Sequence, residues 1–166
     1  IEDAGCELRY NDSIKLVTID TGINITGGVR LGGNNAANEM DDYEEGTFGA
    51  ITGSAMSSAT ITGVYTKVGR KVHIQYKVTS IAVSSTSSGV AFTLPFAVNS
   101  SYNDAVGSAM VQYLNTTGYQ IVCYGYDSVI RPYKINDDSH WIWVDGSDLN
   151  SGGTTTFLFD LTYTAT

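Results

Sequence analysis

The stretch VHIQYKVT at residues 72–79 indicates the fold of this chain most clearly. Its apolar residues occupy every second position, and a period of two places successive side chains on opposite faces of a β-strand. One face of this strand is therefore expected in a core and the other in water, as is common in antiparallel sheets.

The same alternation recurs further along the chain. The alternating apolar residues are Val90, Phe92 and Leu94, then Ala109, Val111 and Tyr113, and finally Phe157, Phe159, Leu161 and Tyr163. Residues 121–126 and 129–135 are further strand candidates, and Pro132 predicts an edge or a bulge in the second. Gly, Ser, Thr and Asn are abundant, as turns require, and no long apolar period of 3.6 is present. The sequence predicts an all-β fold, an antiparallel β-sandwich of jelly-roll type.

Residues 1–40 form a separate region with short strand-like segments and few large apolar residues. Such strands cannot bury a core unaided, so we expect a short β-stalk intertwined with identical chains. The alternative is a loose N-terminal arm packed on the main domain. A charged turn at residues 41–46 places the boundary, and residues 41–166 form the predicted head domain. Because the chain begins at Ile1 within strand-like sequence, we expect it to be a fragment or the C-terminal part of a longer polypeptide.

The charge balance excludes several kinds of partner. Nine Lys and Arg face 17 Asp and Glu, a formal net charge of -8. Without a cationic cluster, neither nucleic acid nor an anionic membrane surface is an expected partner. No apolar run approaches the roughly 20 residues that a membrane span needs. Cys6 and Cys123 belong to no CxxC pair and are predicted to be reduced, partly buried thiols.

The densest charge cluster is Asp41, Asp42, Glu44 and Glu45. Four carboxylates could hold Ca²⁺, but the alternating spacing of a calcium loop is absent. We predict instead a solvated hinge that pairs with Arg and Lys of a neighbouring chain, with no metal and no cofactor.

Catalytic constellations are equally poor. His73 is read as a water-facing strand residue and His140 as the start of a strand, so neither is predicted to be catalytic. Glycan hydrolysis needs two carboxylates about 5–10 Å apart across a cleft. The candidates all lie in predicted turns, where charge is expected anyway: Asp127, Asp137, Asp138, Asp145 and Asp148. No catalytic residue is predicted.

Aromatic residues crowd one third of the chain: Tyr113, Tyr119, Tyr124, Tyr126, Tyr133, Trp141 and Trp143. Rings beside Asn and Asp suit sugar recognition, because a ring stacks on a pyranose while polar groups bind its hydroxyls. The alternative is that they fill the core or a subunit interface. The predicted ligand contacts are Tyr119, Tyr124, Tyr126 and Tyr133. Trp141 and Trp143 are predicted in the core or an interface.

One motif resembles a known family. Residues 39–48 read EMDDYEEGTF, and the C-terminal module of tail fibres and related virion structural proteins of tailed bacteriophages reads leucine-aspartate-aspartate-tyrosine-glutamate-glutamate-glycine-threonine-tryptophan here. Met40 replaces the leucine and Phe48 the tryptophan, and Gly49-Ala50 stands where a proline is common. Similar segments follow at residues 63–69 (GVYTKVG), 94–97 (LPFA), 147–149 and 157–163, and residues 8–13 and 21–27 resemble the repeat that precedes this module in many fibres.

The resemblance implies a homotrimeric fibre tip on a virion that contacts the host surface. We therefore expect a viral structural protein, not an enzyme, that attaches to a host receptor, with a surface glycan as the ligand class. Avidity from three sites on one axis would compensate for weak single contacts. The alternatives are a purely structural trimerising cap, a capsid decoration and, more distantly, a glycan hydrolase.

Overall fold

The structure is a computed structural model that describes residues 5–33, 35, 39–40, 42–102, 105–136 and 139–166. The chain divides into two compact units, residues 1–43 and residues 44–166. No helix in the described part of the chain is long and apolar enough to cross a membrane.

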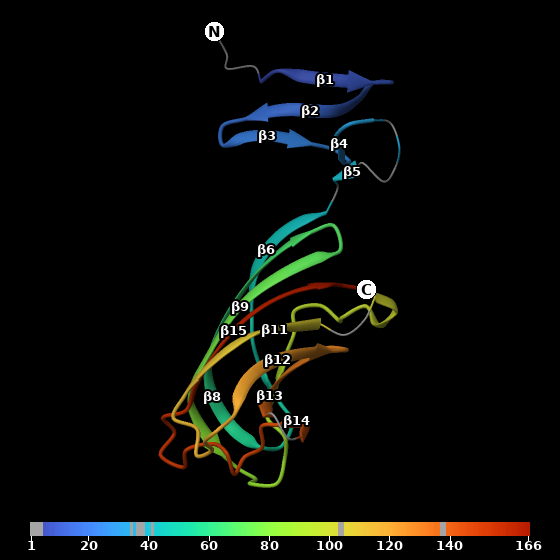
Figure 1. Cartoon of the computed structure of the whole chain (residues 1–166). Helices are drawn as coiled ribbons and strands as arrows, with labels where there is room; N and C mark the ends of the chain where they lie inside the picture. The colour runs from blue at the N-terminus through green and yellow to red at the C-terminus, as the bar shows by residue number, and fades with distance from the viewer. Residues whose placement is uncertain (1–4, 34, 36–38, 41, 103–104, 137–138) are drawn as a thin grey trace. The chain divides into compact units, whose positions relative to one another are not determined.

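The first unit contains two small antiparallel sheets (Figure 1). Three strands form one sheet in the order β1-β2-β3, and a second pair is β4-β5. Their bounds are β1 Glu7–Tyr10, β2 Ser13–Ile19, β3 Gly22–Ile25, β4 Val29–Arg30 and β5 Glu39–Met40. Asn11 and Asp12 join β1 to β2 with positive φ values of 47° and 58°, the geometry that a tight two-residue hairpin requires.

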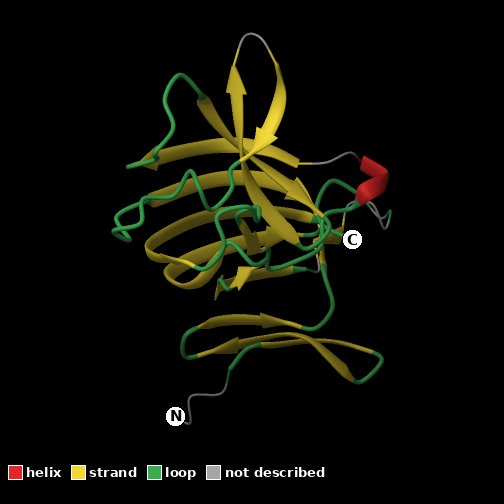
Figure 2. Ribbon diagram, turned by 90° about the horizontal axis from the view of Figure 1, so that it is seen from below, coloured by secondary structure: helices red, strands yellow, loops and turns green. Residues whose placement is uncertain are grey.

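The second unit is built on one ten-stranded antiparallel sheet that curls around its core (Figures 1 and 2). The strand order is β6-β8-β9-β15-β11-β12-β13-β10-β7, and β14 pairs with β13. The bounds are β6 Tyr43–Phe48, β7 Ile51–Thr52, β8 Met56–Val68, β9 Lys71–Val83, β10 Ala91–Thr93, β11 Ala105–Gln112, β12 Gln120–Tyr126, β13 Val129–Asn136, β14 Ser139–Trp143 and β15 Thr156–Thr164. The short turn η2, Ser100–Tyr102, is the one helical element in the described residues.

The core lies where the predicted alternating strands meet. β9 and β15 pair so that Val72, Ile74, Tyr76 and Val78 stand opposite Tyr163, Leu161, Phe159 and Phe157. All eight side chains are buried. Each such burial stabilises the fold by roughly 1.5–3 kcal/mol, so this double row dominates the hydrophobic term. The predicted all-β, sandwich-like fold is confirmed, with the strands in one curled sheet.

A stack of rings fills the centre of this core. Tyr76 stacks on Phe48 with ring centroids 5.0 Å apart and meets Phe92 edge to face at 5.6 Å. Gly63 of β8 makes the stack possible. A Cβ there would lie 2.6 Å from Cδ2 of Tyr76 and 2.7 Å from the carbonyl oxygen of Phe48. Any side chain at this position would displace the rings.

Pro132 does not lie on an edge strand. β13 pairs with β12 along its whole length on one side. On its other side β10 pairs with residues 129–130 and β14 with residues 133–136, so Pro132 falls where the second neighbour changes. A proline is tolerated there because no ladder hydrogen bond from its nitrogen is needed. The edge prediction was wrong for this reason.

Candidate functional site

An exposed cluster of four aromatic rings lies on β12, β13 and β14. It consists of Tyr124, Tyr126, Tyr133 and Trp141, and is called the aromatic surface below. The register pairs Val122 with Tyr133, and Tyr133 with Trp143, so these rings point to one face of the sheet. On the opposite face of the same strands, Cys123 and Ile130 are fully buried in the core. The aromatic surface therefore faces away from the core.

The four rings contact one another in a chain. Tyr124 stacks nearly parallel to Tyr126 at 6.5 Å between centroids and meets Tyr133 edge to face at 5.7 Å. Trp141 lies 5.2 Å from both Tyr124 and Tyr133. Each pair lies within the range of favourable aromatic contacts, so neighbouring rings hold one another in place.

The rings remain accessible despite these contacts. Tyr126 is 54% exposed and Trp141 is 53% exposed, while Tyr124 and Tyr133 are half-buried. Rings carried by paired strands bind a ligand with little loss of side-chain freedom, because their rotamers are already restricted. The arrangement can stack on flat apolar faces, such as the C–H face of a sugar.

Three of the four tyrosines predicted as ligand contacts are therefore brought together, and Tyr119 lies apart from them. Tyr119 lies against Lys134, whose Nζ is 5.6 Å from the centre of its ring. Lys134 points to the opposite face of β13 from Tyr133, because neighbouring residues of a strand alternate.

The two tryptophans are not in the core. Trp141 and Trp143 are about half exposed, so that part of the prediction was wrong, and their place in an interface stays a prediction. The core face of this region is already filled by smaller residues, which leaves the large rings outside. Trp143 lies beside Gly89, where an added Cβ would be 3.6 Å from its ring.

Asp148 is a buried residue that sequence reasoning took for an ordinary turn carboxylate. Its oxygens accept hydrogen bonds from Lys134 Nζ at 2.7 and 2.8 Å and from the backbone N–H of Asp145 at 2.9 Å. Only 8% of its side chain and 11% of that of Lys134 are exposed. Asp148 therefore fixes the turn after β14 and is not available to a substrate.

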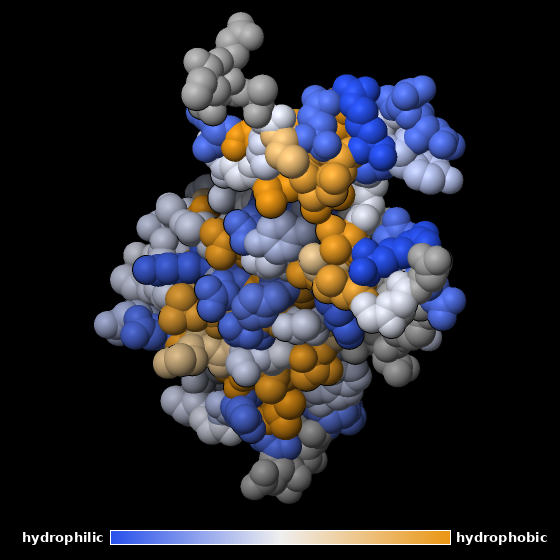
Figure 3. All heavy atoms as spheres, turned by 90° about the horizontal axis from the view of Figure 1, so that it is seen from above, coloured by the Kyte–Doolittle hydropathy of each residue, from blue (hydrophilic) through white to orange (hydrophobic). Residues whose placement is uncertain are grey.

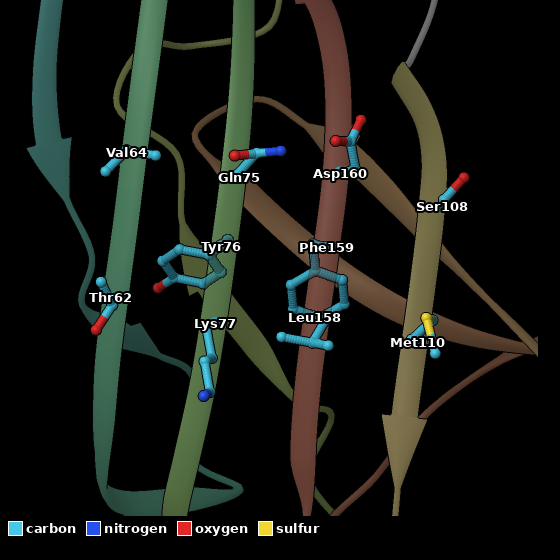
Figure 4. A pocket seen from close by; sticks show the side chains of 10 residues that line it. All are labelled: Thr62, Val64, Gln75, Tyr76, Lys77, Ser108, Met110, Leu158, Phe159 and Asp160. Carbon is cyan, nitrogen blue, oxygen red and sulfur yellow. The ribbon is translucent and has the colours of Figure 1, made fainter.

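A second surface feature is a groove of about 460 Å³ on the outer face of β8, β9, β15 and β11 (Figure 4). Two cross-strand rows line it. One row is Val64, Gln75, Asp160 and Ser108, and the other is Thr62, Lys77, Leu158 and Met110. Met110 is 70% exposed, and Val64 and Leu158 are also exposed. Hydrophobic and hydrophilic patches likewise alternate on the surface shown in Figure 3.

This outer face also holds the one histidine–carboxylate contact in the described residues. His73 Nδ1 lies 3.1 Å from Thr162 Oγ1, and its Nε2 is 3.9 Å from Asp160. Ser108 stands opposite Asp160, but no hydrogen bond joins Ser108 to His73 within the described structure. A nucleophile needs a base within hydrogen-bond reach, so these residues do not form a triad here.

The predicted acidic hinge gives no metal site in the described residues. Glu44 and Glu45 are neighbours in β6, so their side chains alternate between faces, and Asp41 lies outside the described residues. The described part of the chain contains no group of three or more His, Cys, Asp or Glu able to hold a metal. Of the turn carboxylates, Asp145 accepts hydrogen bonds from Ser147, Asp127 is exposed, and Asp137 and Asp138 lie outside the described residues.

The two cysteines differ in their surroundings. Cys123 is fully buried, and desolvation raises the pKa of its thiol to about 12. A thiol with such a raised pKa is inert as a nucleophile at neutral pH. Cys6 is exposed, and both are free thiols.

Comparison with protein-family models, with curated proteins and with solved structures found no match.

Proposed function

We propose that this chain is a non-catalytic attachment module, the tip of a bacteriophage tail fibre, that assembles as a homotrimer and binds a host-surface glycan. The aromatic surface is the observation that carries the proposal. The motif resemblance at residues 39–48 supports the virion setting, which is a proposal of the same standing.

The aromatic surface favours a binding function because its rings contribute nothing to the core. Cys123, Ile130 and Pro132 cover the inner face of β12 and β13, so folding does not require large rings on the outer face. Exposed aromatic clusters of this kind are typical of recognition sites. Their stacked and tilted geometry suits a sugar ring better than a flat hydrophobic partner, since edges and faces are both accessible.

Two exposed apolar faces support assembly with further copies of the chain. In the first unit, Leu8, Leu16 and Ile25 align across β1, β2 and β3, and Leu8 and Ile25 are exposed. A sheet of three short strands needs a covered apolar face to be stable. In the second unit, the groove row containing Leu158 and Met110 exposes further apolar area. Identical chains that cover such faces would bury them symmetrically.

The proposal is tested by binding and adsorption. Tyr126→Ala and Trp141→Ala should each weaken binding to a glycan array at least tenfold and reduce competition with virion adsorption. Tyr113→Ala is the matched control, because Tyr113 is also an exposed tyrosine (67%) but lies at the end of β11. Unchanged adsorption with both aromatic variants would refute receptor binding by this surface and leave a purely structural cap.

A further inference from the structure

Arg131 lies on the same face of β13 as the aromatic surface. It stands directly opposite Tyr124 in the β12–β13 register, and it precedes Tyr133 by two residues. It also lies between the residues of β13 that pair with β10 and those that pair with β14. The guanidinium group is thus placed among the rings.

The Nε of Arg131 is buried and has no hydrogen-bond partner in the described structure. A buried donor without an acceptor is costly, and more so when it belongs to a charged group. Arginine cannot reduce this cost by losing its proton, because its pKa exceeds 12. An acceptor supplied from outside the chain would remove the cost.

Other cations of the chain have partners where the structure describes them. Arg9 binds Glu7 and Arg30 binds Glu39, each at 2.8 Å, and Lys134 binds Asp148 at 2.7 Å. Arg131 forms no ion pair among the described residues. An unpaired, partly desolvated guanidinium beside exposed rings is a feature of sites that recognise planar anions, since its fork matches a carboxylate in two hydrogen bonds.

We propose that the aromatic surface selects carboxylated sugars, with the carboxylate bound by Arg131 and the sugar ring stacked on Tyr126 or Trp141. This inference rests on the proposed function and names its ligand class. The chain's net charge of -8 opposes a polyanion at long range. Charges more than about 8 Å apart are screened at physiological ionic strength, so the contact at Arg131 determines the preference.

The ligand class is tested first with the unaltered protein. The probes are uronic-acid oligosaccharides and the same oligosaccharides with each carboxyl reduced to a primary alcohol. A charge-assisted pair of hydrogen bonds corresponds to at least about tenfold tighter binding of the acidic form. Equal binding of the acidic and reduced probes would overturn this inference and leave the proposed function standing. Failure of every glycan to bind would refute the proposed function and the inference together.

Two variants then assign the preference to Arg131. Arg131→Gln should abolish the preference for the acidic probe and leave binding of the reduced probe unchanged, and Arg131→Lys should keep part of it. Lys77→Gln is the control, because it removes a cation from the outer face of β9, where the other groove residues lie. A preference that survives in Arg131→Gln but is lost in Lys77→Gln would place the carboxylate in the groove and overturn the assignment.

Discussion

The buried ion pair between Lys134 and Asp148 offers a quantitative test of how the second unit is held together. Asp148→Leu replaces the carboxylate by an apolar side chain of similar size, and Lys134→Met does the same for the ammonium group. Each single variant leaves one buried charge without its partner. Breaking a buried pair in this way typically costs about 3–5 kcal/mol.

The structure places the expected cost for Asp148→Leu near the lower end of this range, about 3 kcal/mol. The carboxylate accepts three hydrogen bonds, one of them from the backbone of Asp145. However, the flexible lysine stem can carry its ammonium group toward water, which relieves part of the penalty. For a unit the size of residues 44–166 such a loss lowers Tm by roughly 10 °C.

The double variant separates the ion pair from local packing. Lys134→Met with Asp148→Leu removes both charges, so it should recover most of the loss and differ from the unaltered protein by about 1 kcal/mol, the value of the lost hydrogen bond to Asp145. Urea unfolding of the four proteins gives the coupling energy. A coupling below about 0.5 kcal/mol would mean that the pair behaves as a surface ion pair, contrary to its burial.

Two further predictions follow from burial and exposure. Burial raises the pKa of Tyr163 and of the Cys123 thiol to about 12 each, so the folded state favours their protonated forms. Their contribution to stability is complete below about pH 9 and is lost as pH rises toward 12, and Tyr163→Phe should flatten the fall in urea midpoint over this range. Light scattering should give a mass about three times the chain's 17.8 kDa, and Ile23→Lys, on the exposed face of β3, should lower it to that of a single chain. A monomeric mass for the unaltered protein would contradict the homotrimer.

The sequence predicted the core strands well because burial on one face imposes a period of two. Phe157, Phe159, Leu161 and Tyr163 share a face by that rule alone, and the structure pairs them with the alternating residues of β9. The rule says nothing about which strands are neighbours. The placement of Pro132 could not be predicted for that reason, since it depends on β10 and β14 meeting β13 from the same side.

The candidate site was predictable only in part for the same physical reason. Alternation alone puts Tyr124 and Tyr126 on one face of β12. Whether that face also carries Tyr133 and Trp141 depends on the register between strands, which a single sequence does not determine. The role of Asp148 was missed because its partner, Lys134, lies on another strand and no local pattern connects the two.

The position of Arg131 links folding and recognition in β13. Its neighbours Ile130 and Pro132 point inward and complete the core, so alternation obliges Arg131 to face outward among the rings. Neither the core nor an ion pair in the described residues accounts for an arginine at this position. A side chain that stability does not require, with a buried Nε lacking an acceptor, is better explained by a ligand than by the fold. Substitutions at Tyr126 and Trp141 should accordingly change binding while leaving the free energy of unfolding within about 0.5 kcal/mol, because neither ring supports the core.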